Sequence, residues 1–142
     1  MRSITDTEFK YKDMLQAFLN IQVIGQTSIN FLNERKLAKE MKKYAGLFNE
    51  AGEEALKGFS KDFVEMCLSS KSYGTTFFGT IHMSDGGAAS RLATDIDDVT
   101  GNIPGRFGLA DEYRPLRSAL FDAYLSEIKE GSRLLSELGI NV

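Results

Sequence analysis

Residues 11–32 read YKDMLQAFLNIQVIGQTSINFL, and this stretch decides the fold class that we expect for the chain. One face of a helix drawn through it carries Tyr11, Leu15, Phe18, Gln22, Gly25, Ile29 and Leu32. That face is widened by Met14, Ile21, Ile24 and Phe31. A spacing of three to four positions is typical of an amphipathic helix, and a face this wide is typical of a central one. The prediction is one long helix that begins near the capping-box sequence Thr5–Glu8 and continues to Leu32.

Glycine at position 25 costs about 1 kcal/mol relative to alanine inside a helix. We therefore expect Gly25 to mark either a close crossing of two helices or a break, and we prefer the crossing. The next segment, Asn33–Lys43, predicts a short amphipathic helix with one basic face made of Arg35, Lys36, Lys39, Lys42 and Lys43. Such a face suits an acidic partner, a phosphate or a membrane surface, but it is more often a solvated helix face, and we prefer the latter.

Further helices are expected along the rest of the chain. Gly46 and Gly52 should bracket a turn before a helix over residues 49–72, whose apolar stripe includes Cys67 as a buried thiol. Residues 75–83 fit either a strand or a helix, and we favour the helix because a single strand would lack a partner. A helix over residues 85–100 should stop at Gly101, with a loop from Asn102 to Gly108, since the residue before Pro104 is disfavoured in a helix. The last helix should begin between Asp111 and Pro115.

Together these patterns predict an all-α fold, an antiparallel bundle of four to five helices with a Gly-rich central connection. The 142 residues, of which 42% are apolar, fit a single helical domain over residues 1–142. A net charge of −3 argues against a nucleic-acid partner. One cysteine fits a reducing compartment, and no segment resembles a signal peptide or a membrane span, so we expect a cytoplasmic protein without a membrane partner.

A functional site is most simply placed in the segment from Tyr73 to Gly108. This segment contains seven of the thirteen glycines and the only histidine. The candidate ligand-binding residues there are His82, Asp85, Arg91 and Arg106. Small residues after Asp85 place free amides at an expected helix start, which would favour a phosphate-bearing small molecule. The alternative, which we prefer, is a capped turn that lets two helices pack closely.

Carboxylates form the second candidate site. Glu50 and Glu54 on one helix, with Asp95 and Asp98 on another, could hold Mg²⁺ against the phosphates of a nucleotide. The two pairs distantly resemble the Glu-x-x-Glu and Glu-x-x-Asp pattern of the all-helical nucleotide pyrophosphohydrolases. The gap between the pairs is longer here and Asp95 stands where that pattern has glutamate, so we do not assign the chain to that family. Solvated acidic faces are the alternative, and we prefer them.

No catalytic motif is complete, because His82 is the only histidine and no nucleophile elbow or phosphate-binding loop is present. We therefore expect a non-enzymatic binding or regulatory module that acts through its surface, with a protein partner or by self-association as a homodimer. The alternative is a Mg²⁺-dependent hydrolase of nucleotides or phosphate esters that uses the four carboxylates. No cofactor is expected.

Overall fold

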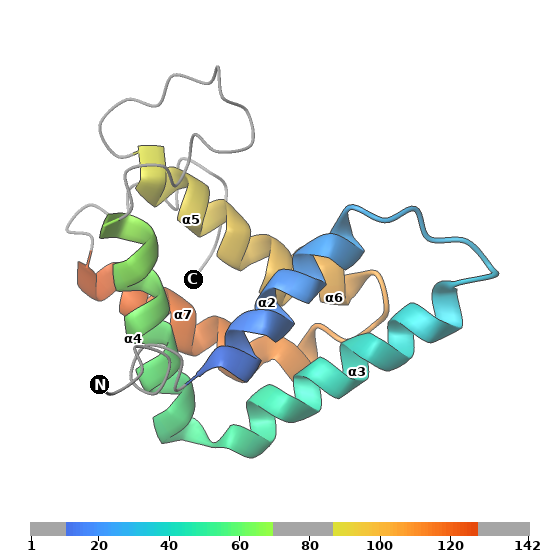
Figure 1. The fold of residues 1–142 in the computed structure, drawn as a ribbon, viewed down its shortest axis with the longest axis horizontal. Helices are drawn as coiled ribbons and strands as arrows, with labels where there is room; N and C mark the ends of the chain where they lie inside the picture. Colours follow the sequence, from blue (N-terminus) through green and yellow to red (C-terminus); the bar gives the residue numbers. More distant parts are fainter. Residues whose placement is uncertain (1–10, 70–86, 128–142) are drawn as a thin grey trace, which may run out of the picture.

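The computed structural model describes residues 11–69 and 87–127, and these residues form helices joined by short connections (Figure 1). The longer helices are α2 (Lys12–Gly25), α3 (Glu34–Ala51), α4 (Glu53–Ser69), α5 (Gly87–Asp97) and α7 (Arg114–Glu127). Between α5 and α7 lie a π-helix (Asp98–Asn102), the short α6 (Ile103–Gly105) and a 3₁₀ turn (Asp111–Tyr113). The described residues contain no strand, so the prediction of an all-α bundle is confirmed.

The helices pack around one shared core. α2 lies against α3, the π-helix and α6, while α5 lies against α4 and α7, and the most extensive packing joins α4 to α7. α2 and α3 run in opposite directions (Figure 1), whereas α4 and α7 run side by side in the same direction. The largest fully buried side chains come from α2, α3, α5 and α7: Phe18, Ile21, Met41, Phe48, Leu92, Ile96, Leu116, Leu120, Phe121 and Tyr124, joined by Tyr113. α4 contributes the buried Phe59 and Val64 to the same core. Cys67 is buried among them, as predicted.

α2 is shorter than the sequence predicts. It ends at Gly25, and a Cβ atom placed there would overlap Cδ1 of Ile103, so the expected close crossing is present at the end of the helix. Residues 26–33 form a loop in which Asn30 and Asn33 bind nearby backbone groups. Such local hydrogen bonds compete with helix formation, which explains why the prediction of a helix through Leu32 is wrong.

α3 is longer than predicted, because Gly46 lies inside it and does not begin a turn. The buried stripe Met41, Ala45 and Phe48 continues past Gly46, and burial of the phenylalanine outweighs the cost of about 1 kcal/mol for a helical glycine. The turn lies at Gly52 alone, whose φ of 94° favours glycine.

The expected stop at Gly101 and the expected loop from Asn102 are also wrong. α5 continues without interruption into the π-helix, and Ile103 is helical despite preceding Pro104. Both Ile103 and Pro104 are buried, and proline in the first turn of α6 loses only an amide that has no helical partner there. Burial of these two side chains therefore overrides the local preference. The chain turns instead at Gly108, with φ of 71°.

The final described helix begins where predicted, with the 3₁₀ turn from Asp111 leading into α7 at Arg114. No described helix combines the length and the apolar character that a membrane span requires. The predictions for the capping box Thr5–Glu8, for residues 75–83 and for the chain beyond Glu127 fall outside the described residues.

Candidate functional site

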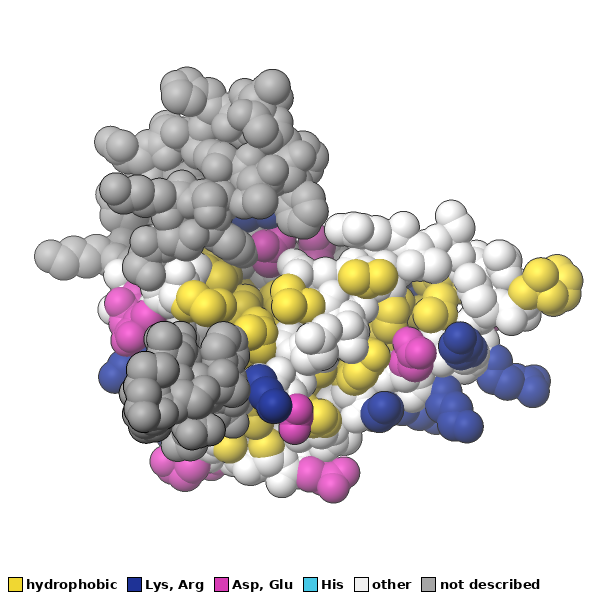
Figure 2. Space-filling view, in the orientation of Figure 1, with side chains coloured by type: hydrophobic (Ala, Val, Ile, Leu, Met, Phe, Trp, Pro, Cys, Tyr) yellow, Lys and Arg dark blue, Asp and Glu magenta, His cyan; other side chains and the backbone are white. Residues whose placement is uncertain are grey.

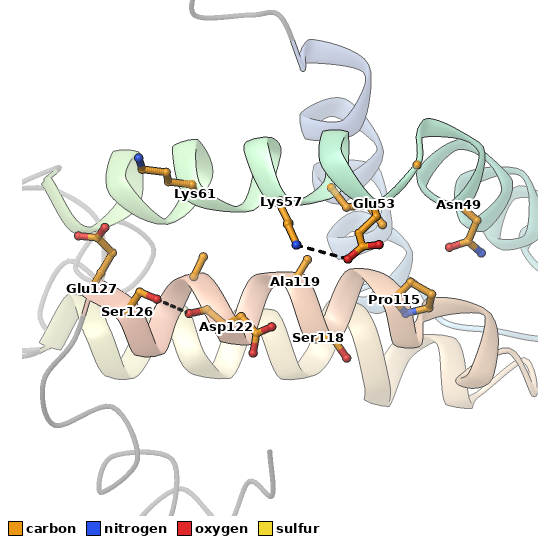
Figure 3. A pocket seen from close by; sticks show the side chains of 13 residues that line it. Asn49, Glu53, Lys57, Lys61, Pro115, Ser118, Ala119, Asp122, Ser126 and Glu127 are labelled. Carbon is orange, nitrogen blue, oxygen red and sulfur yellow. Dashed lines mark hydrogen bonds and ion pairs between the residues drawn. The ribbon is translucent and has the colours of Figure 1, made fainter.

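A groove of about 730 Å³ runs between α4 and α7 (Figure 3). It is lined by Asn49, Gly52, Glu53, Leu56, Lys57, Lys61, Pro115, Ser118, Ala119, Asp122, Ala123, Ser126 and Glu127. This volume falls within the range of about 300–1,000 Å³ that is usual for ligand pockets. The groove is therefore of the size that a bound ligand usually occupies.

Small side chains create the groove. Ala119 and Ala123 lie one helical turn apart on α7 and, together with Leu56 of α4, form its apolar floor. The neighbouring large residues of α7, Leu120 and Tyr124, point instead into the core. Because alanine fills little volume, the surface between the two helices is hollowed where larger residues would close it.

The two sides of the groove carry opposite charges. Lys57 and Lys61 project from α4, whereas Asp122 and Glu127 project from α7 (Figure 3). The remaining charged group, Glu53, forms an ion pair with Lys57 at 3.3 Å between Oε1 and Nζ. These side chains are exposed. The groove thus offers an apolar floor between an α4 edge of net charge +1, where Glu53 pairs with Lys57, and an anionic α7 edge.

The arginines of the predicted ligand site bind groups of their own chain. Arg91 Nε lies 3.4 Å from Oδ1 of Asp95, one turn along α5, and the Asp95 side chain is nearly buried. Arg106 donates a hydrogen bond of 3.1 Å from Nη1 to the carbonyl of Gly25. A cation at this carboxyl end of α2 complements the helix dipole. His82 and Asp85, the other two candidates, lie outside the described residues.

The four predicted metal ligands lie in different settings. Glu50 and Glu54 are exposed near the junction of α3 and α4, Asp95 pairs with Arg91, and Asp98 accepts a hydrogen bond of 2.8 Å from Nδ2 of Asn102. Across residues 11–69 and 87–127, no group of three or more His, Cys, Asp or Glu side chains could hold a metal ion.

The π-helix is fixed to α7 by Arg117. Its Nη1 lies 2.9 Å from Oδ1 of Asp97 and 3.3 Å from Oγ1 of Thr100. The guanidinium also lies 5.0 Å from the ring centre of Phe121. A Cβ atom at Gly101 would lie 2.8 Å from Nη1, so a side chain at this position would displace the guanidinium. The acidic residues near position 97 therefore have a structural role.

Two buried tyrosines hold helices together. Tyr113 Oη donates a hydrogen bond of 2.6 Å to the carbonyl of Met41, and Tyr124 Oη donates one of 2.9 Å to the carbonyl of Ala89. Burial raises the pKa of both phenols, because the charged phenolate loses its hydration there. Both phenols are therefore donors, and neither faces the groove.

The comparisons with known proteins give one assignment. A family described as a family of unknown function, DUF6553, matches residues 5–137. The chain belongs to the DUF6553 family. No curated protein and no solved structure matches it. The DUF6553 match covers residues 5–137 and therefore includes every residue that lines the groove.

Sequence reasoning placed the site elsewhere and did not identify the groove in this DUF6553 chain. The signal that was available is the pair Ala119 and Ala123, two small residues four positions apart on an otherwise large apolar stripe. The opposite edge, with Lys57 and Lys61 also four positions apart, comes from a helix about 60 residues earlier in the chain. Only their packing side by side reveals the groove.

Proposed function

We propose that this protein is a non-enzymatic binding module whose α4–α7 groove receives an amphipathic helix of a protein partner. The observation that carries the proposal is an apolar floor between edges of opposite charge. A helix lying in such a groove buries its apolar face and can place charged side chains against both edges. A partner of this kind matches the groove on shape and on charge.

The dimensions of the groove support a helix of a few turns. Glu53 to Lys61 on α4 spans about 12 Å, and Pro115 to Glu127 on α7 spans about 18 Å, at a rise of 1.5 Å per residue. Two to three turns of a partner helix would fill this length. Small apolar residues at positions i, i+3 or i+4, and i+7 would contact Leu56, Ala119 and Ala123.

The charges and the helix directions specify the partner further. Acidic residues on one side of its helix would face Lys57 and Lys61, and basic residues on the other would face Asp122 and Glu127. Because α4 and α7 both begin at the same end of the groove, their amino termini attract a negative helix end there. The partner helix is therefore expected to run antiparallel to both.

A pair of designed helical peptides tests this proposal. Both carry the same leucine and alanine face, and they differ only by exchange of their acidic and basic flanks. Fluorescence anisotropy should detect binding of the matched peptide, with Ala119→Phe abolishing it by filling the floor. The double variant Lys57→Glu and Lys61→Glu should lose the preference for the matched peptide, because both edges of its groove are then acidic. Equal affinity for both peptides, or binding that survives Ala119→Phe, would refute the groove as a helix site.

Self-association is a second candidate function, favoured by the outer face of α2. Leu19 and Val23, one turn apart, are 43% and 62% exposed, and a copy of the same helix could cover them. Light scattering should then give a dimer that Val23→Glu converts to a monomer. A monomer for the unaltered protein at all accessible concentrations would remove this candidate.

The hydrolase and phosphate-ligand alternatives have less support, because Asp95 pairs with Arg91, Asp98 binds Asn102, and Arg106 binds the end of α2. A nucleotide panel with Mg²⁺ tests both, by phosphate release and by thermal stabilisation. Turnover that is lost in Asp98→Ala would favour the hydrolase, and a rise in melting temperature without turnover would favour the phosphate ligand.

A further inference from the structure

The α2–α3 loop lies at one extremity of the molecule (Figure 1), and two of its large apolar side chains are exposed to solvent. Phe31 and Leu32 are 87% and 80% exposed, more than any other large apolar side chain of the described residues. Single exposed apolar residues are ordinary, but two adjacent ones on a projecting turn form a compact apolar tip. We call Phe31 and Leu32 the loop tip.

Hydrogen bonds hold the loop tip in place. Asn30 Oδ1 accepts bonds from the amides of Leu32 at 2.8 Å and Asn33 at 3.2 Å. Asn33 in turn accepts a bond from the amide of Asn30 at 2.8 Å and donates one to the carbonyl of Ser28 at 2.9 Å. Polar side chains thus satisfy the backbone of the loop while the two apolar side chains point outward. The tip is preorganised, so binding through it costs little ordering.

A cationic face adjoins the loop tip on α3. It comprises the exposed residues Arg35, Lys36, Lys39, Lys42 and Lys43, on the side of the helix opposite the buried Met41 and Ala45. None of the ion pairs between described residues uses these five cations. Figure 2 shows Lys and Arg side chains gathered beside the apolar extremity.

The charge of the chain is strongly divided. Residues 34–43 carry five cations and two carboxylates, a net charge of +3, which leaves −6 for the remainder of a chain whose total is −3. A surface of negative charge would therefore attract this end of the molecule and repel the rest. The charge distribution selects the loop tip as the part that makes first contact.

We propose that the loop tip and the cationic face of α3 dock the protein onto an anionic lipid surface. Phe31 and Leu32 would enter the boundary between headgroups and acyl chains, and the lysines would lie against the anionic headgroups. A lipid surface is favoured over an acidic protein because four of the five cations are lysine, which is depleted at protein interfaces. The tip is also convex, and an extended surface needs no matching pocket to receive it.

Vesicle binding is the first test, using phosphatidylcholine vesicles with and without phosphatidylglycerol. The protein should sediment with vesicles that contain phosphatidylglycerol and not with pure phosphatidylcholine, and high salt should weaken binding. Each of Lys36→Gln and Lys39→Gln should lower the partition coefficient about fivefold, and Phe31→Ala should lower it at least about tenfold. Matched controls, Lys12→Gln and Met66→Ala, alter an exposed cation and an exposed apolar residue elsewhere and should leave it unchanged.

Fluorescence gives a second test, because the chain contains no tryptophan. Phe31→Trp places a single fluorophore at the tip, and its emission should shift to the blue on vesicles that contain phosphatidylglycerol and be quenched by brominated lipids. Met66→Trp should show neither change. All these positions are exposed, so circular dichroism should confirm that every variant folds.

Two outcomes would overturn the proposal. One is equal binding by the Phe31→Ala and Met66→Ala variants. The other is an absence of binding to vesicles that contain phosphatidylglycerol at low salt. If an acidic polypeptide, poly-glutamate, then binds the cationic face, the surface is assigned to an acidic protein instead.

Discussion

Two connecting segments meet at the end of α2, and one exposes its apolar side chains whereas the other buries them. The loop over residues 26–33 exposes Phe31 and Leu32, whereas the segment over residues 98–110 buries Ile103 and Leu109. Both are held by asparagine side chains, Asn30 and Asn33 in the first and Asn102 in the second. A loosely held backbone therefore does not explain why one segment exposes its apolar side chains and the other buries them.

The contrast teaches which segment stabilises the fold. Ile103 fills the space left by the absent side chain of Gly25, and Arg106 binds the carbonyl of the same glycine. The 98–110 segment thus closes the core against α2, while the 26–33 loop contributes an outward surface. Apolar residues that face solvent on a fixed backbone point to binding more than to folding.

Among the variants that test this contrast, Ile103→Ala is expected to have the largest effect on stability. Loss of this buried side chain should lower the free energy of unfolding by about 2–4 kcal/mol, whereas Phe31→Ala should change it by no more than about 0.5 kcal/mol. Urea unfolding followed by circular dichroism measures both. Similar losses in the two variants would show that the loop tip also contributes to folding.

The crossing itself is tested by Gly25→Ala. The added methyl group would overlap Ile103 Cδ1, and overpacking of this kind costs about 1–3 kcal/mol. The double variant with Ile103→Val should recover part of the loss, because a shorter side chain makes room. A Gly25→Ala variant as stable as the unaltered protein would show that α2 and α6 separate easily.

The 98–110 segment leads into Tyr113, and the buried phenol of this residue makes the free energy of unfolding depend on pH. Burial raises the pKa of this phenol above its ordinary value of 10.0, so its neutral form favours the folded state. That stabilisation is fully present below the unfolded-state pKa and is lost as the pH rises from there through the folded-state pKa. Above pH 10 the free energy of unfolding should therefore fall by about 1.4 kcal/mol per pH unit for this group.

Tyr113→Phe removes this contribution, so its stability should decline less steeply in alkaline solution than that of the unaltered protein. Urea midpoints measured at a series of pH values from neutral upward give the two slopes. Equal slopes would mean that Tyr113 does not titrate with unfolding.

The smallest effect in this series is expected from Asn30→Ala. Loss of two exposed hydrogen bonds to the loop backbone should cost about 0.5–1 kcal/mol, as for the removal of a helix cap. Vesicle binding should weaken as well, because the loop tip is no longer fixed. A variant with weaker stability but unchanged vesicle binding would separate the order of the loop from its proposed role.

Much of this architecture was accessible from periodicity, and the errors have physical causes. The prediction that the last helix begins between Asp111 and Pro115 is confirmed by α7, and the stripe that includes Cys67 predicts α4. Glycine and proline misled the prediction at Gly46, Gly101 and Pro104, where burial of neighbouring side chains outweighs local preference. Asparagine misled it at residues 26–33, since apolar spacing alone does not reveal side chains that bind the backbone.

The candidate site was less accessible than the fold. The sequence pattern predicts a site at the acidic residues near position 97. In the structure, however, Asp97 is bound by Arg117 from a helix that begins 17 residues later. The sequence pattern predicts no site at Ala119 and Ala123, although these two alanines shape the groove. A concavity between helices depends on which helices become neighbours, and residue types within one helix do not specify that.

The buried thiol of Cys67 offers a practical consequence. A chain with one cysteine, enclosed in its core, reacts with a thiol reagent only when the packing around α4 opens. The labelling rate in native solvent would therefore report how readily that region opens, without denaturant or an introduced probe. Cys67 thus reports on the opening of α4, the helix that forms one wall of the groove. A partner bound in the groove should therefore slow the labelling of this cysteine.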